Sequence, residues 1–265
     1  MSLVRQPSVE SRSIWGREAG LQLDRGMTRL GVAATSAQME RLGTYGALLL
    51  KWNRTYNLLG ATSAETLVDE HLLDSLAIIP SLKRWLEQQQ ASAAADESVG
   101  IQEASCASTA AHCGRQRLVD VGTGAGLPGL VVAIMLADLE VTLVEPIGKK
   151  TAFLRQAIAE CRVPRVTILE AKLEDLTPAA LIGSGNGRPH PHFICRAFTS
   201  LERFAELSKP HLRPGSLLFA MKALRVTEEL EQLGSSTEVL AVEPLDTLRI
   251  DVQRNLVVMR AVSPA

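Results

Sequence analysis

The chain of 265 residues is long enough for one large domain with additions or for two small domains. Its apolar fraction of 46% is ordinary for a globular protein, and its net charge of −1 excludes an overall basic surface for nucleic acid. The longest apolar run, residues 130–137, is far shorter than the roughly 20 residues that cross a bilayer, so we expect a soluble protein with no membrane partner.

The chain begins with an extension, residues 1–34, that contains several arginines and serines. Glu10, Glu18 and Asp24 interrupt them, and no apolar core of a signal peptide is present. We therefore expect this extension to be poorly ordered.

Residues 35–86 are predicted to form a small N-terminal helical cap. Thr35 with Gln38 is a T-x-x-Q capping box, and apolar residues follow it at spacings of three and four. A second box, Thr62 with Glu65, predicts another helix. The next segment, residues 87–116, is rich in Ala, Ser and Gln with little to bury, which predicts a flexible insert.

From residue 117 to residue 265 short apolar strands alternate with helices, which predicts a parallel sheet covered on both faces. The last two strands, within residues 238–250 and 254–261, have no helix between them and should pair antiparallel. The earlier strands and helices are predicted at residues 118–121, 127–137, 141–145, 148–160, 166–170, 192–196, 201–207, 216–222 and 227–233.

A glycine-rich turn, L-V-D-V-G-T-G-A-G-L-P-G, follows the first of these strands. One register is G-x-G-x-x-G through Gly124, Gly126 and Gly129, which is a weak signal for a dinucleotide. The other register is acid-x-G-x-G-x-G, from Asp120 through Gly122, Gly124 and Gly126. A turn with no ligand is disfavoured, because glycines weaken a purely structural turn.

The acidic register favours S-adenosylmethionine (SAM). The Asp120 carboxylate can face the cationic amino-acid end of SAM, whereas it would repel a pyrophosphate. Glu145, at the end of the second strand, can accept hydrogen bonds from the ribose, although a nicotinamide dinucleotide carries the same ribose. The acidic turn A-K-L-E-D-L after the third strand is placed to meet an adenine. An NAD-dependent oxidoreductase stays the alternative.

Six segments together resemble the RsmG (GidB) family of bacterial 16S ribosomal RNA guanine-N7 methyltransferases. They are K-W-N-R-T-Y-N-L-L, H-L-L-D-S-L, D-V-G-T-G-A-G-L-P-G, G-K-K-T-A-F-L-R-Q, C-R-A-F-T-S-L and R-N-L-V-V-M-R, and the similarity runs from about residue 38 to residue 262 outside the insert. The resemblance implies a Rossmann-like class I SAM-dependent methyltransferase fold, α/β, with a mostly parallel seven-stranded sheet, and a guanine in the 530 loop as substrate.

The resemblance also implies which residues contact SAM. Carried over motif by motif, they are Gly122, Leu127, Leu173, Glu174 and Arg196. Together with Asp120, Gly124, Gly126 and Glu145 from the residue patterns, they make up the predicted cofactor site. Two departures are that Glu145 stands where an aspartate is common, and that Ala223 replaces the usual glycine after Lys222.

Guanine N7 carries a lone pair and no proton at neutral pH, so the reaction needs alignment and no general base. Arg196 is the candidate catalytic residue, because a guanidinium can bind guanine O6 or the SAM carboxylate. The alternative is a salt bridge from Arg196 to Asp120 or Glu174. A non-catalytic RNA-binding assembly factor is a further alternative for the whole chain.

Cysteine and histidine patterns raise competing sites. Cys195 lies where RNA cytosine-C5 methyltransferases have a nucleophile, but a buried thiol is favoured. His71, Asp74 and Ser75 share one helix face without a G-x-S-x-G elbow, so a helix contact is favoured over a hydrolase triad. No C-x-x-C spacing occurs, which favours reduced thiols in the cytoplasm and no metal.

The expected partner is 16S ribosomal RNA or the small ribosomal subunit, with a protein that is itself a monomer. Lys149 and Lys222 are the predicted substrate contacts, because basic residues near strand ends can bind phosphates. Trp52, Tyr56 and Phe198 are candidates to stack on an extruded base, although each fits a core position equally well.

Overall fold

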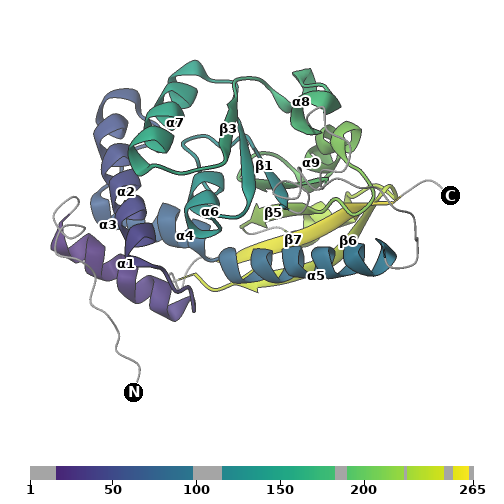
Figure 1. Cartoon of the computed structure of the whole chain (residues 1–265), viewed down its shortest axis with the longest axis horizontal. Coiled ribbons are helices and arrows are strands. Elements are labelled where there is room, and N and C mark those ends of the chain that lie inside the picture. The colour runs from purple at the N-terminus through teal and green to yellow at the C-terminus, as the bar shows by residue number, and fades with distance from the viewer. Residues whose placement is uncertain (1–15, 98–114, 183–189, 224–225, 248–252, 263–265) are drawn as a thin grey trace, which may run out of the picture.

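The computed structural model describes residues 16–97, 115–182, 190–223, 226–247 and 253–262. Figure 1 shows a central sheet with helices on both faces, and a group of N-terminal helices beside it. Residues 1–15 of the predicted extension, residues 98–114 of the predicted insert and residues 248–250 of a predicted strand lie outside the described ranges.

Seven strands form one sheet in the order β3-β2-β1-β4-β5-β7-β6. The first five are parallel, and β7 is antiparallel to both of its neighbours. The mostly parallel sheet and its antiparallel closing pair are therefore confirmed. The strands are β1 (Arg117–Val121), β2 (Glu140–Val144), β3 (Val166–Leu169), β4 (Pro191–Arg196), β5 (Leu218–Lys222), β6 (Thr237–Leu245) and β7 (Arg254–Ala261).

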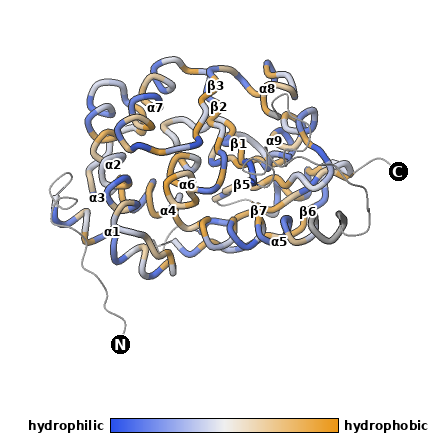
Figure 2. Tube along the Cα trace, in the orientation of Figure 1, coloured by the Kyte–Doolittle hydropathy of each residue, from blue (hydrophilic) through white to orange (hydrophobic). Residues whose placement is uncertain are grey.

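Alternate residues of the strands enter two separate hydrophobic clusters, one on each face of the sheet. Leu118 of β1 belongs to one cluster and Val119 to the other. The segments between the strands fold into α6 (Gly129–Met135), α7 (Gly148–Cys161), η2 (Leu173–Asp175), α8 (Pro178–Ile182), α9 (Leu201–Ser208), η3 (Lys209–His211) and α10 (Val226–Glu231). Figure 2 shows apolar residues concentrated along α6 and the inner strands.

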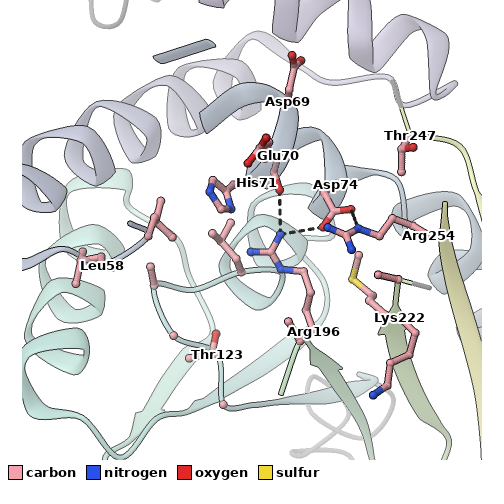
Figure 3. A pocket seen from close by; sticks show the side chains of 18 of the residues that line it. Leu58, Asp69, Glu70, His71, Asp74, Thr123, Arg196, Lys222, Thr247 and Arg254 are labelled. Carbon is pink, nitrogen blue, oxygen red and sulfur yellow. Dashed lines mark hydrogen bonds and ion pairs between the residues drawn. The ribbon is translucent and has the colours of Figure 1, made fainter. Parts of the chain in front are cut away.

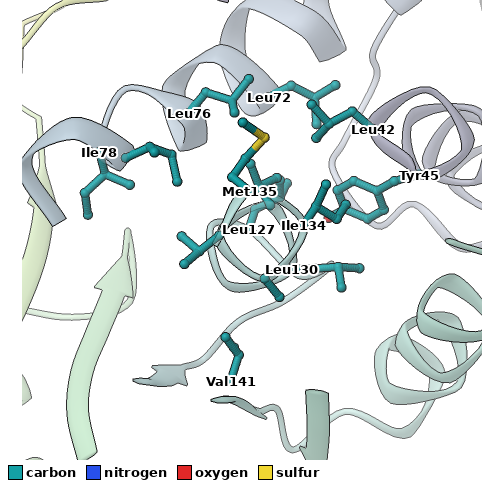
Figure 4. Close-up of a cluster of buried hydrophobic side chains, with 14 of the residues drawn as sticks. Leu42, Tyr45, Leu72, Leu76, Ile78, Leu127, Leu130, Ile134, Met135 and Val141 are labelled. Carbon is teal, nitrogen blue, oxygen red and sulfur yellow. The ribbon is translucent and has the colours of Figure 1, made fainter. Parts of the chain in front are cut away.

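The N-terminal helices pack on α6 and share its hydrophobic cluster. Figure 4 shows Leu42 and Tyr45 on one side of α6 and Leu72 and Leu76 above it. All four side chains are buried in the larger cluster. The helices are α1 (Arg17–Arg29), α2 (Ser36–Tyr56), α3 (Ala64–Leu67), the π-helix η1 (Val68–Leu72), α4 (Leu73–Leu76) and α5 (Ile79–Glu97).

The prediction that the N-terminal extension is poorly ordered is wrong for residues 17–29, which form α1. Ala19, Leu23 and Met27 recur every four residues and are buried, so the segment has the apolar stripe of an amphipathic helix. The capping box of Thr35 and Gln38 is confirmed at the start of α2. The predicted second cap is displaced by one residue, because Ser63 caps α3.

The prediction of a flexible insert is wrong for residues 87–97, which form the C-terminal part of α5. This stretch is rich in Ala, Gln and Glu, which are strong helix formers. The helix is fastened to β6, because Arg84 Nη2 donates to Glu243 Oε2 at 2.6 Å and Trp85 Nε1 donates to Glu243 Oε1 at 2.9 Å. Figure 1 shows α5 lying along β7 and β6.

Candidate active site

The glycine turn after β1 adopts a backbone that only glycine fits without cost. Gly122, Gly124 and Gly126 have φ angles of +66°, +61° and +94°. At Gly122 space is also restricted, because a Cβ there would lie 2.3 Å from Cδ2 of Phe198. Gly129 has another role: a Cβ would lie 2.5 Å from Asp120 Oδ2. Gly129, the third glycine of the dinucleotide pattern, therefore leaves space for the buried Asp120 carboxylate and not for a ligand.

Asp120 is fully buried beneath this turn and lines neither of the two cavities beside it. Its Oδ2 accepts hydrogen bonds from Thr123 Oγ1 at 2.5 Å and from Gly129 N at 2.8 Å. Its Oδ1 is buried and has no hydrogen-bond partner among the described residues. Burial raises the pKa of the Asp120 carboxyl to about 6. The carboxyl shapes the turn and keeps one oxygen unsatisfied.

The main cavity, of about 480 Å³, lies at the carboxyl edge of the parallel strands, where open α/β sheets bind ligands. Figure 3 shows its walls, formed by the glycine turn, η1, α4 and the ends of β4, β5 and β7. Among the predicted cofactor residues, Gly122, Gly124, Leu127 and Arg196 line it.

Arg196 is held at the wall of the main cavity by Asp74. Its Nη1 donates to Asp74 Oδ2 at 2.9 Å and to the Glu70 carbonyl at 3.4 Å. Neither Asp120 nor Glu174, the two predicted ion-pair partners, is its partner; the salt bridge is formed with Asp74 instead. Arg254 Nε donates to the other Asp74 oxygen at 2.9 Å.

Asp74 and Arg254 were not predicted as site residues. Both belong to segments that the resemblance uses, H-L-L-D-S-L and R-N-L-V-V-M-R. They are some 180 residues apart in sequence, so spacing alone does not reveal their pairing. The available signal was an acid within the leucine-rich segment H-L-L-D-S-L-A-I-I, since an acid that becomes buried there needs a cationic partner.

His71 belongs to the π-helix η1, and helices of this type are frequent at functional sites. Its side chain lies beside that of Arg196 (Figure 3). Burial, and then the charge of Arg196, lower the pKa of His71 to about 4, so its imidazole is neutral at pH 7. Ser75 Oγ donates to the His71 carbonyl at 2.6 Å. This hydrogen bond is the helix contact expected from the sequence, and Ser75 is fully buried, so it is not placed as a nucleophile.

A second cavity, of about 320 Å³, meets the main one at Gly122. Leu173 and Glu174 line it together with Val144 and Phe198. Six of the nine predicted cofactor contacts thus line two adjoining cavities, the more polar one with Arg196 and the more apolar one with Leu173.

Glu145 and Gly126 line neither cavity. The Glu145 carboxylate accepts hydrogen bonds from Gly124 N at 2.9 Å and Ile147 N at 3.0 Å, and so ties the turn to the start of α7. Gly126 is enclosed by α7, α6 and α2, because a Cβ added to it would lie 2.9 Å from Leu154, 3.0 Å from Leu130 and 3.1 Å from Tyr45 Oη. Tyr45 Oη itself donates to the Ala125 carbonyl at 2.6 Å.

The two lysines predicted to contact RNA do not come together. Lys222 lines the main cavity, but its Nζ forms an ion pair with Glu229 at 2.8 Å. Lys149 Nζ donates to the Tyr56 carbonyl at 3.3 Å, away from that cavity. Of the three aromatic candidates, Phe198 is 37% exposed beside Gly122 and lies nearest the site.

Cys195 is 1% exposed, and burial strongly raises the pKa of its thiol. A thiolate nucleophile is therefore disfavoured at this position. Within the described ranges, no three His, Cys, Asp or Glu side chains are grouped as metal ligands would be. No helix in the part of the chain that the structure describes is both long and apolar enough to span a membrane.

These features fit SAM as the ligand. Left-handed glycines let the backbone approach it closely, the unsatisfied Asp120 oxygen lies beneath the turn, and two adjoining cavities match its polar and apolar ends. With the sheet order, they define a class I SAM-dependent methyltransferase.

The family model described as rRNA small subunit methyltransferase G (GidB) matches residues 38–92 and 101–257, and the chain belongs to this family. Its similar relatives include the ribosomal RNA small subunit methyltransferase G of Bordetella avium (strain 197N), 34% identical over 91% of this chain and 93% of the relative. Another, with the same description and from Leptothrix cholodnii, is 33% identical over 91% and 94%. The predicted family, methyltransferase activity and SAM cofactor are confirmed, and the oxidoreductase alternative is set aside.

Proposed function

We propose that this chain methylates N7 of a guanine in the 530 loop of 16S ribosomal RNA, acting as a monomer in the cytoplasm. The observation that carries the proposal is the position of Arg196 at the cavity wall, beside the glycine turn and fixed by Asp74. The family supports small-subunit ribosomal RNA as the substrate class.

SAM, when bound, supplies a methyl group on a sulfonium. The chain's part is alignment, since guanine N7 attacks through its own lone pair. Gly122, Gly124 and Leu127 would hold the amino-acid side of SAM, and Leu173 with Glu174 the adenine side.

Arg196 Nη1 is occupied by Asp74 and Glu70. The other guanidinium nitrogens have no partner among the residues that the structure describes and can bind guanine O6 or the SAM carboxylate. The neutral imidazole of His71 adds no positive charge beside the sulfonium. The proposed machinery thus orients two ligands and takes no proton from guanine.

The test is methyl transfer to 16S ribosomal RNA or small subunits from cells that lack the gene. Reduction and aniline cleavage followed by primer extension should give a stop in the 530 loop, as expected for N7-methylguanine. Arg196→Ala should lose most of the activity while the protein stays folded, whereas Arg260→Ala, at an exposed position of β7, should keep the activity. Methylation of another atom or another loop would refute the assignment without touching family membership.

A further inference from the structure

The fold brings a second arginine to the active-site edge of the sheet. Because β7 is antiparallel to β5, it begins where the parallel strands end. Lys222, the last residue of β5, pairs in register with Asn255, and Arg254 directly precedes Asn255. Arg196 ends β4 at the same edge. Two arginines that are far apart in the sequence therefore line one cavity.

A single buried carboxylate holds both arginines. Asp74 is 5% exposed, and its two oxygens accept from Arg196 Nη1 and Arg254 Nε, each at 2.9 Å. Figure 3 shows the two guanidinium groups meeting at Asp74. Two cations share one anion here, so each guanidinium is only partly neutralised and the N–H groups that Asp74 does not use can bind a further anionic group.

Arg254 has donors left for that group. Its Nε is used by Asp74, whereas its Nη1 and Nη2 make no hydrogen bond or ion pair within the part of the chain that the structure describes. Asp74 fixes the plane of the guanidinium, so less side-chain entropy is lost when two parallel N–H groups bind an oxyanion.

We propose that Arg254 binds a backbone phosphate of the RNA beside the target guanine. This inference rests on the proposed function. Arg254 is 30% exposed and Arg196 is 16% exposed, so Arg254 is the outer of the two. In a nucleotide extruded into a pocket, the base goes in and the phosphates stay at the mouth. Phosphate contacts fix the register of the nucleic acid, which is the alignment that N7 attack requires.

The acidic residues of the same cavity leave room for a phosphate at this wall. Asp69, Glu70 and Glu229 also line the cavity. Glu229 is paired with Lys222, Glu70 contacts Arg196 through its backbone carbonyl, and the Asp69 carboxylate points away from both guanidinium groups (Figure 3). The carboxylate of SAM has the same hydrogen-bonding chemistry as a phosphate. The experiment therefore has to separate these two anions.

The experiment compares Arg254→Gln with Arg260→Gln in the full-length protein. Both arginines lie on β7 and pair with a carboxylate, but Arg260 is 55% exposed and lies outside the cavity. Affinity for a fluorescent 16S fragment that contains the 530 loop is measured across a salt series, and SAM affinity by calorimetry. In Arg254→Gln, RNA binding should weaken about tenfold and the slope of log K against log salt should become shallower by about 1.

SAM affinity should change less than about twofold, and Arg260→Gln should match the wild type in both assays. Loss of SAM affinity with unchanged RNA affinity would identify the cofactor carboxylate as the ligand and overturn the proposal. Unchanged values in both assays would leave Arg254 as a structural partner of Asp74 alone. Arg254→Lys, which keeps the charge, should retain the salt slope. Both assays measure binding, so their results do not depend on which guanine atom is methylated. A failure of the N7 assignment would therefore be detected separately, in the methyl-transfer test.

Discussion

Asp74→Asn tests whether the buried carboxylate positions Arg196 for the reaction. The asparagine has nearly the same shape, but it has one carbonyl oxygen where the carboxylate has two charged ones. It can accept from one arginine only, and its amide nitrogen then faces the N–H groups of the other. Both present contacts are 2.9 Å long, and Asp74 is 5% exposed.

The cost follows from these contacts. One charge-assisted hydrogen bond is lost, at roughly 1.5–3 kcal/mol, and the other becomes a neutral acceptor at a further loss of about 1 kcal/mol. Since Arg254 is 30% exposed, water screens part of the loss. We expect the free energy of unfolding to fall by about 2–3 kcal/mol, below the roughly 3–5 kcal/mol for breaking a fully buried ion pair. Released from Asp74, Arg196 should lose alignment, with kcat reduced roughly 10- to 100-fold.

The assays are denaturant unfolding and initial rates of tritiated methyl transfer at saturating SAM. Glu243→Gln is the matched control, because Glu243 also accepts from an arginine and a second donor, Trp85, far from the cavity. It should lose stability without losing kcat. If Asp74→Asn kept kcat and lost only as much stability as the control, Asp74 would have no positioning role.

Two further predictions concern the glycine turn. Gly122→Ala should abolish SAM binding in calorimetry, because its Cβ would lie 2.3 Å from Phe198. Gly124→Ala, whose Cβ would have its nearest neighbour at 4.0 Å, should weaken SAM binding about tenfold through backbone strain alone. Equal losses of SAM affinity in the two variants would contradict this prediction. Asp120 has a pKa raised by burial from 3.8 to about 6, so the folded state holds its proton more tightly and the associated stability, present below pH 3.8, is lost as the pH rises through 6. In the absence of SAM, Asp120→Asn should remove this pH dependence of stability. The free energy of unfolding of the variant relative to the wild type should therefore rise by up to about 3 kcal/mol between pH 4 and pH 7. Parallel pH profiles of stability for the two proteins would refute the prediction.

The sheet and its glycine turn were predictable because their signals are local. A strand such as L-V-D-V followed by closely spaced glycines has few alternatives, and the closing strand pair follows from the missing helix between them. Thr35 and Gln38 likewise identify the start of α2 within one turn of helix. These predictions depend on neighbours within a few residues.

The predictions that failed are those that depend on tertiary packing. Residues 87–97 read as a linker because they offer little to bury, but helix propensity and the contacts of the preceding residues with Glu243 keep them helical. Lys222 read as a free cation, but α10 brings Glu229 to it. Arg196 was assigned to the site, yet its partner Asp74 lies 122 residues away. Pairings at such separations are set by topology, which one sequence does not display.

The N-terminal helices form part of the candidate site and are more than a cap beside it. Tyr45 of α2 donates to the Ala125 carbonyl within the glycine turn, and η1 and α4 supply His71 and Asp74 to the cavity wall. Their apolar faces belong to the same buried cluster as α6, which follows that turn. Because interiors are close-packed, a shift of these helices moves the turn and Arg196 together. Both regions therefore supply walls of the candidate site, and neither region by itself holds the alignment that methyl transfer requires.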